Sequence, residues 1–314
     1  MRNKNAILFG NGLNLVGGEC PSWEDLLKDL SHQKVGMPSD SNTLNYECIY
    51  LDLCDNKYIG DGNSKDDEYE LKKQIADLCE RIPTNKFYRR LIELPVDTYL
   101  TTNYDGVLDK TLLKQGYKID SAQSCRTEAL YSIRRCHAYY YPYEQITKKV
   151  LPIHGECSAP KSIMIGYDQY CGSLGKLNDF LKGYYTYKSN EQTVKLAEIK
   201  DRLIGKCEDI EVNSLGSYWP DYFFTHDVHM IGIGLPLVES DLWWVLNKRC
   251  RYKRTSSIIN NNIYFYGEPD ESIVRLLRAF DVQIVPIEVR DKKDPMCWEE
   301  AYNQMFNELE NNLK

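Results

Sequence analysis

The feature that most constrains the fold is an apolar stretch that runs directly into a glycine-spaced turn near the N-terminus. Residues 6–9 (Ala-Ile-Leu-Phe) are followed by Gly10-Asn11-Gly12-Leu13-Asn14, and residues 23–30 then have helical apolar spacing. In a doubly wound α/β sheet this order brings backbone N–H groups up to a dinucleotide phosphate. Position 15 is leucine, whereas the full G-x-G-x-x-G pattern requires glycine there. Two interpretations therefore stay open, a nucleotide-binding loop and a simple tight turn.

Short apolar runs recur along the chain and are separated by segments with helical patterns. We expect strands at residues 6–9, 95–102, 150–153, 163–167, 229–234, 263–266 and 282–287, and one near 119–125. We expect helices at residues 23–30, 45–54, 66–81, 87–94, 107–114, 170–187, 191–204, 219–224, 242–251, 272–280 and 298–309. Strands that alternate with helices predict an α/β fold with a mainly parallel sheet. We expect one domain over residues 1–314, with helical insertions at about 31–90 and 170–225.

Composition excludes several functional classes. The formal net charge of −7 argues against a nucleic-acid binder, which needs a large basic face. No apolar run approaches the roughly 20 residues that cross a bilayer, so we expect a cytoplasmic protein without membrane contact. The 11 cysteines form no C-x-x-C pair, which excludes a zinc ribbon and predicts reduced thiols and no metal.

Polar residues follow several of the predicted strands, and three of them carry chemistry. In a parallel sheet the strand ends share one edge, so we expect Asn103, Asp105 and His154 to meet in one glycine-rich crevice. A histidine can act as a general base, and an asparagine amide can hold a sugar hydroxyl or a water. The structural alternatives are a packed imidazole and turn-forming side chains, which are common at strand ends.

Six motifs in chain order resemble the bacterial sirtuin-like family. They are GNGLN at 10–14, PSWEDLL at 21–27, LTTNYD at 100–105, PIHGE at 152–156, SIMIGYDQY at 162–170 and GIGLPLVESDLWW at 232–244. Sirtuins carry a glycine-rich loop after the first strand, a T-Q-N-x-D strand end, a histidine-glycine strand end and a late glycine loop, in this order. The resemblance extends over about 230 residues.

The resemblance implies a Rossmann-like domain that cleaves the nicotinamide–ribose bond of NAD+. Helical tracts stand in place of the zinc module of protein-deacylating sirtuins, which favours the anti-phage NADases of the family. The resemblance assigns hydrolysis to Asn103 and His154. It also implies that Asp105 contacts the carboxamide of the nicotinamide. The residues that it implies for the rest of the NAD+ site are Gly10, Asn11, Gly12, Leu13, Asn14, Thr101, Gly232, Gly234 and Leu235.

Several positions depart from the family pattern. Asn11 and Asn14 replace a small residue and a hydroxyl, Gly234 replaces a serine or threonine, and residues 21–23 stand where Phe-Arg is usual. The alternatives to NAD+ hydrolysis are protein deacylation or ADP-ribosyl transfer, and a non-catalytic NAD or ADP-ribose sensor. Unregulated hydrolysis of NAD+ would kill the cell. We therefore expect the activity to be controlled by formation of a homo-oligomer or by a separate regulatory protein.

Overall fold

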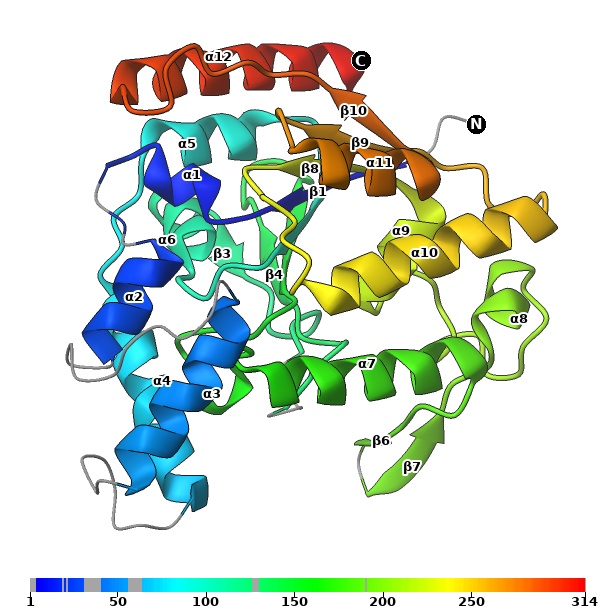
Figure 1. Cartoon of the computed structure of the whole chain (residues 1–314). Helices are drawn as coiled ribbons and strands as arrows, with labels where there is room; N and C mark the ends of the chain where they lie inside the picture. The colour runs from blue at the N-terminus through cyan, green and yellow to red at the C-terminus, as the bar shows by residue number, and fades with distance from the viewer. Residues whose placement is uncertain are drawn as a thin grey trace.

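A computed structural model describes residues 4–18, 20, 22–30, 41–55, 64–125, 130–189 and 191–313. An eight-stranded sheet runs through it in the order β10-β9-β8-β1-β2-β5-β4-β3, and the strands from β10 to β5 are parallel (Figure 1). The strands are β1 (Lys4–Phe9), β2 (Thr98–Thr101), β3 (Lys118–Ile119), β4 (His137–Tyr140), β5 (Thr147–Pro152), β8 (His226–Ile231), β9 (Ile263–Tyr266) and β10 (Val282–Val285). The predicted mainly parallel α/β fold is confirmed.

The first strand lies at the centre of the sheet, between β8 and β2. Side chains alternate across a strand, so Ala6 and Leu8 enter one hydrophobic core while Ile7 and Phe9 enter the other. All four side chains are buried. A strand that is apolar on both faces must be covered on both faces, and this requirement produces the three-layer fold.

Two groups of helices cover the sheet. The core that contains Ile7 and Phe9 is closed by α1 (Gly12–Leu15), α2 (Trp23–Leu30), α3 (Asn42–Asp55), α4 (Ser64–Glu80), α5 (Lys86–Glu93), α6 (Val107–Lys114) and α12 (Pro295–Asn312). The core that contains Ala6 and Leu8 is closed by α7 (Tyr167–Lys182), α8 (Ile199–Leu203), α9 (Trp219–Thr225), α10 (Ser240–Thr255) and α11 (Glu271–Ala279). Figure 1 shows α3 beside α4 at one end of the molecule and α12 along its upper edge.

Three predicted elements differ from the structure. Residues 163–166 form no strand; Met164 instead donates its N–H to the His154 carbonyl at 2.9 Å, which holds this apolar segment beside the end of β5. The helix expected over 191–204 is replaced by a hairpin, β6 (Thr186–Ser189) with β7 (Gln192–Lys195), and by the short α8. The strand expected near 119–125 is reduced to β3, which pairs with β4 in antiparallel orientation.

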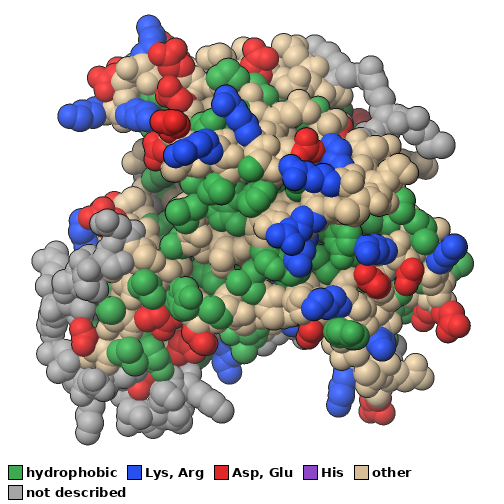
Figure 2. Space-filling view, turned by 45° about the vertical axis from the view of Figure 1, so that its right-hand side comes forward, with side chains coloured by type: hydrophobic (Ala, Val, Ile, Leu, Met, Phe, Trp, Pro, Cys, Tyr) green, Lys and Arg blue, Asp and Glu red, His purple; other side chains and the backbone are tan. Residues whose placement is uncertain are grey.

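The surface agrees with the charge of the sequence. Figure 2 shows basic, acidic and hydrophobic side chains interspersed on one face, with no broad basic region there. Within the described ranges, none of the helices combines the length and the apolar character needed to cross a bilayer.

Candidate active site

The carboxyl ends of β1, β2, β5, β8 and β9 lead into loops that surround one cavity of about 840 Å³. This volume lies in the range of small-molecule sites, and its position is the one that α/β sheets use for ligands. The predicted site residues that line it are Asn11, Gly12, Asn103, Asp105, His154, Gly232 and Gly234. The predicted site residues that do not line it are Gly10, Leu13, Asn14, Thr101 and Leu235.

The glycines at 10 and 12 allow two loops to approach each other. A Cβ atom on either would lie 2.8 Å from the Gly232 carbonyl oxygen, closer than real Cβ atoms come. Gly12 donates its N–H to that carbonyl at 2.8 Å, and Gly10 donates to Ile231 at 3.2 Å. Gly232 itself has a φ of +57°, which favours glycine. The glycine spacing at positions 10 and 12 therefore allows this loop to pack against the loop at Gly232.

The rest of the first loop is also turned inward. The N–H groups of Leu13 and Asn14 donate to the carbonyls of Gly10 and Asn11. Leu13 is fully buried in the core. The N–H groups at 10, 12, 13 and 14 are thus bonded within the protein in this conformation. Asn11 and Gly12 are its cavity-lining residues.

Asn14 and Asp105 are bonded to each other. The Asn14 amide donates from Nδ2 to Asp105 Oδ2 at 2.6 Å, and Asn14 Oδ1 accepts from the Tyr88 hydroxyl at 2.6 Å. Asp105 Oδ1 accepts from the Val107 N–H at 2.7 Å. Burial raises the pKa of Asp105, while these two hydrogen bonds lower it. Asn14 therefore supports Asp105 from behind, where the sequence predicted a direct contact with NAD+.

Asn103 brings an amide to the wall of the cavity. Its side chain lines the cavity and is 8% exposed, and its backbone N–H donates to Thr101 Oγ1 at 3.0 Å. The amide also lies beside the Tyr88 hydroxyl and donates to it, which opposes the rise in the pKa of Tyr88 that burial causes. Because the amide has two N–H groups, Asn103 can donate to a ligand in the cavity as well.

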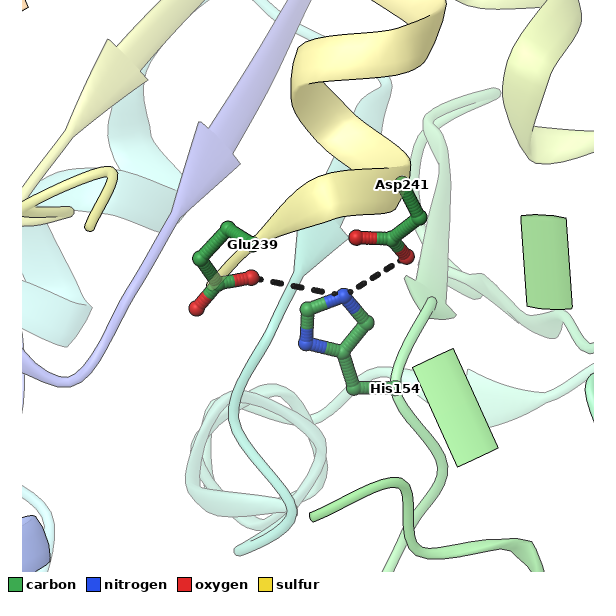
Figure 3. A group of neighbouring side chains, drawn as sticks. All are labelled: His154, Glu239 and Asp241. Carbon is green, nitrogen blue, oxygen red and sulfur yellow. Dashed lines mark hydrogen bonds and ion pairs between the residues drawn. The ribbon is translucent and has the colours of Figure 1, made fainter. Parts of the chain in front are cut away.

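His154 follows β5 and faces two carboxylates from the loop after β8 and the start of α10 (Figure 3). Its Nε2 lies 3.0 Å from Asp241 Oδ2 and 3.6 Å from Glu239 Oε2. Its Nδ1 lies 3.5 Å from the Tyr170 hydroxyl. Gly155, the next residue, has a φ of +94°, a conformation that favours glycine, and a Cβ atom there would lie 2.2 Å from the Ser162 carbonyl oxygen.

The carboxylates decide the protonation state of this histidine. Burial by itself lowers the pKa of His154, but the charges of Asp241 and Glu239 outweigh it and raise the pKa to about 9. Burial raises the pKa of Glu239 to about 7 against the opposing charge of His154. At neutral pH the ring is therefore an imidazolium, whereas Glu239 lies close to its titration midpoint.

Sequence reasoning included Glu239 and Asp241 in a motif but gave them no role. They follow the predicted late glycine loop in the segment Val238-Glu239-Ser240-Asp241. Two carboxylates just beyond a strand end were the available signal. Their link to His154, more than 80 positions earlier, depends on the neighbouring positions of β5 and α10 in space.

A metal ion is the other occupant that such a cluster could hold. Ligand atoms of His154, Glu239 and Asp241 lie within 4.8 Å of one another. His154 Nε2, however, is directed at Asp241 at hydrogen-bond distance, and the raised pKa of the ring keeps a proton on it. A metal ion would therefore have to displace this proton, because it binds a neutral imidazole.

A parallel α/β sheet with a ligand cavity at its strand ends defines a Rossmann-like nucleotide-binding class. Residues 97–194 match the model of the SIR2-like domain, and this range contains Asn103, Asp105 and His154. The chain is also 28% identical over 169 residues to the NAD(+) hydrolase ThsA of Acinetobacter baumannii (strain 532279). The alignment covers 54% of this chain and 30% of that relative, so the chain spans less than a third of its length. The match to the SIR2-like domain over residues 97–194 agrees with the predicted resemblance to the bacterial sirtuin-like family.

Proposed function

We propose that this protein is an NAD+ glycohydrolase that releases nicotinamide and ADP-ribose. The observation that carries the proposal is that the Asn103 amide and the charged His154 cluster line one cavity at the strand ends. The SIR2-like match and the similarity to an NAD(+) hydrolase support NAD+ as the substrate. The cavity volume of about 840 Å³ suits a dinucleotide.

The chemistry would proceed through a ribose with oxocarbenium character. Nicotinamide leaves as a neutral molecule, because the electron pair of the broken C1′–N bond neutralises its pyridinium nitrogen. Asn103 would donate to a ribose hydroxyl or to the attacking water. Asp241 and Glu239 would supply negative charge near the developing cation, and His154 would hold these carboxylates in place. Asp105 would orient the nicotinamide amide.

The test is incubation of the purified chain with NAD+, with nicotinamide and ADP-ribose as readouts. We expect Asn103→Ala and His154→Ala to lower nicotinamide release by about 10³-fold and to keep the far-UV spectrum of the wild type. His226→Ala is the matched control, because His226 lies at the opposite end of β8 and does not line the cavity. Full activity in the Asn103 and His154 variants would contradict the proposal.

The same assay separates the alternative functions. Nicotinamide release that depends on an acylated peptide would indicate a deacylase, and transfer of label to a protein would indicate an ADP-ribosyltransferase. Tight NAD+ binding without turnover under every condition would indicate a sensor.

We further propose that NAD+ depletion serves anti-phage defence in the cytoplasm. Unrestrained hydrolysis would exhaust the NAD+ of the host cell, so a homo-oligomer or a separate regulatory protein would control the enzyme. Phage infection of cells that carry the wild-type or the His154→Ala gene tests the role, with cellular NAD+ as the readout. A monomer that hydrolyses NAD+ at full rate without a partner would contradict the proposed control.

A further inference from the structure

We propose that Glu239 is the catalytic base that accepts the proton of the attacking water. The inference rests on the proposed NAD+ hydrolysis and assigns a role to a residue that sequence reasoning passed over. It starts from a difference among the three members of the His154 cluster (Figure 3): His154 and Glu239 line the cavity, whereas Asp241 does not.

Glu239 is the carboxylate of the cluster that faces the cavity. It occupies the N-cap position of α10, lines the cavity and keeps 12% of its side chain exposed. The Tyr170 hydroxyl donates to its carboxylate, and His154 Nε2 lies 3.6 Å from its Oε2. A carboxylate has further acceptor sites beyond these two contacts. Asn103, whose amide is a donor, lines the same cavity.

Asp241 is not free to accept this proton. Its side chain is 1% exposed and does not line the cavity. Its Oδ2 faces His154 Nε2 at 3.0 Å, and its Oδ1 accepts from the Leu242 N–H at 2.9 Å. Asp241 is therefore a positioning residue that fixes the ring beside Glu239.

His154 is not the base either, because it already carries a proton near neutral pH. Its positive charge favours the ionised form of Glu239, and Asp241 opposes that form. The hydroxyls of Tyr170 from α7 and Tyr104 from the loop after β2 also lie in this environment. Together these influences give Glu239 a pKa of about 7. A pKa near the working pH suits a base that acts at neutral pH.

The step balances without any further reactant. The water oxygen forms a bond to C1′ of the ribose while the C1′–N bond breaks. The electron pair of the broken bond goes to nicotinamide. One water proton passes to the Glu239 carboxylate, and the hydroxyl remains on ADP-ribose. Solvent later removes the proton from the glutamic acid.

The test compares Glu239→Gln and Glu239→Ala with the wild type and with Glu271→Gln. Glu271 is exposed on the first turn of α11 and does not line the cavity, so we expect wild-type rates from its variant. We expect both Glu239 variants to bind NAD+ and to release nicotinamide 10²- to 10³-fold more slowly, the range of general-base effects. Sodium azide should restore nicotinamide release in Glu239→Ala and yield azido-ADP-ribose, because the azide anion has no proton to lose.

Each result decides one question. Loss of hydrolysis in both variants, together with azide rescue, supports the base role. Hydrolysis by Glu239→Gln within about threefold of the wild type overturns it, as does a loss in Glu239→Ala that azide fails to rescue. A wild-type protein that releases no nicotinamide would instead overturn the proposed function.

Discussion

One buried histidine, His137, lies on β4 beside β5, another, His154, follows the end of β5, and each meets two carboxylates. His154 meets Asp241 and Glu239, and His137 on β4 meets Asp109 at 2.7 Å and Glu156 at 2.8 Å. Burial lowers the pKa of each ring, but the carboxylates raise both values to about 9. Residue type and charge state therefore do not distinguish the two clusters.

The difference lies in their bonding and access. Both nitrogens of His137 lie within 2.8 Å of carboxylate oxygens, and Arg135 donates to Glu156 at 2.6 Å. This cluster borders a void of about 20 Å³, room for no more than one water. The His154 cluster instead borders the large cavity, which His154 and Glu239 both line. We infer that a closed charge network stabilises the fold, whereas an open one is available for chemistry.

The largest effect that tests this contrast concerns stability. His137→Ala should lower the free energy of unfolding by about 3 kcal/mol, because it leaves Asp109 and Glu156 buried without their shared counter-ion. Urea unfolding measures the loss, and NAD+ hydrolysis per folded molecule should stay within about twofold. A variant that folds with wild-type stability but has lost activity would reverse the roles of the two histidines.

The raised pKa of His137 also predicts how the stability of the protein depends on pH. The folded-state pKa of His137 is raised from 6.5 to about 9, so its contribution is complete below pH 6.5 and is lost as pH rises through 9. His154 acts in the same window. His137→Ala should therefore show a smaller decline in stability between pH 6.5 and 9 than the wild type.

Asp241→Asn should have an intermediate effect, on activity. The amide keeps the size of the side chain but removes the charge that holds the His154 proton, so we expect kcat to fall by about 10- to 100-fold. The alkaline limb of the pH–rate profile should move to lower pH, because His154 then loses its proton more easily. The profile and kcat are measured together, and a lower kcat with an unmoved limb would indicate a purely structural role for Asp241.

The smallest effect is the pH dependence of the wild-type enzyme. Below pH 7, kcat/KM for NAD+ should fall about tenfold per pH unit as Glu239 becomes protonated, and it should fall again above pH 9 as His154 loses its proton. Glu239→Gln should lack the acidic limb. Steady-state rates between pH 5 and 10 provide the check, and an acidic limb that persists in the variant would assign it to another group.

Much of the site was predictable from local patterns. Apolar runs that end in polar residues located the ends of β1, β2, β5 and β8, and parallel pairing then brought Asn103, Asp105 and His154 to one cavity. The glycines at 10, 12 and 232 were also recognised, and the structure shows that they allow two loops to approach closely. The helical spacing of apolar residues gave a wrong prediction at residues 192–195. These residues pair with β6 in a hairpin, and this pairing outweighs the local helical pattern.

The sequence by itself determined the alternation of strands and helices, the parallel sheet and the edge where a ligand would bind, because these follow from the spacing of apolar residues and glycines. Only the tertiary structure decided which polar groups meet. Asn14 is bonded to Asp105, Asn103 lines the cavity, and Glu239 lies beside a histidine that precedes it by more than 80 residues. Hydrogen-bond satisfaction and burial depend on neighbours that are distant in the chain, and no local pattern records them.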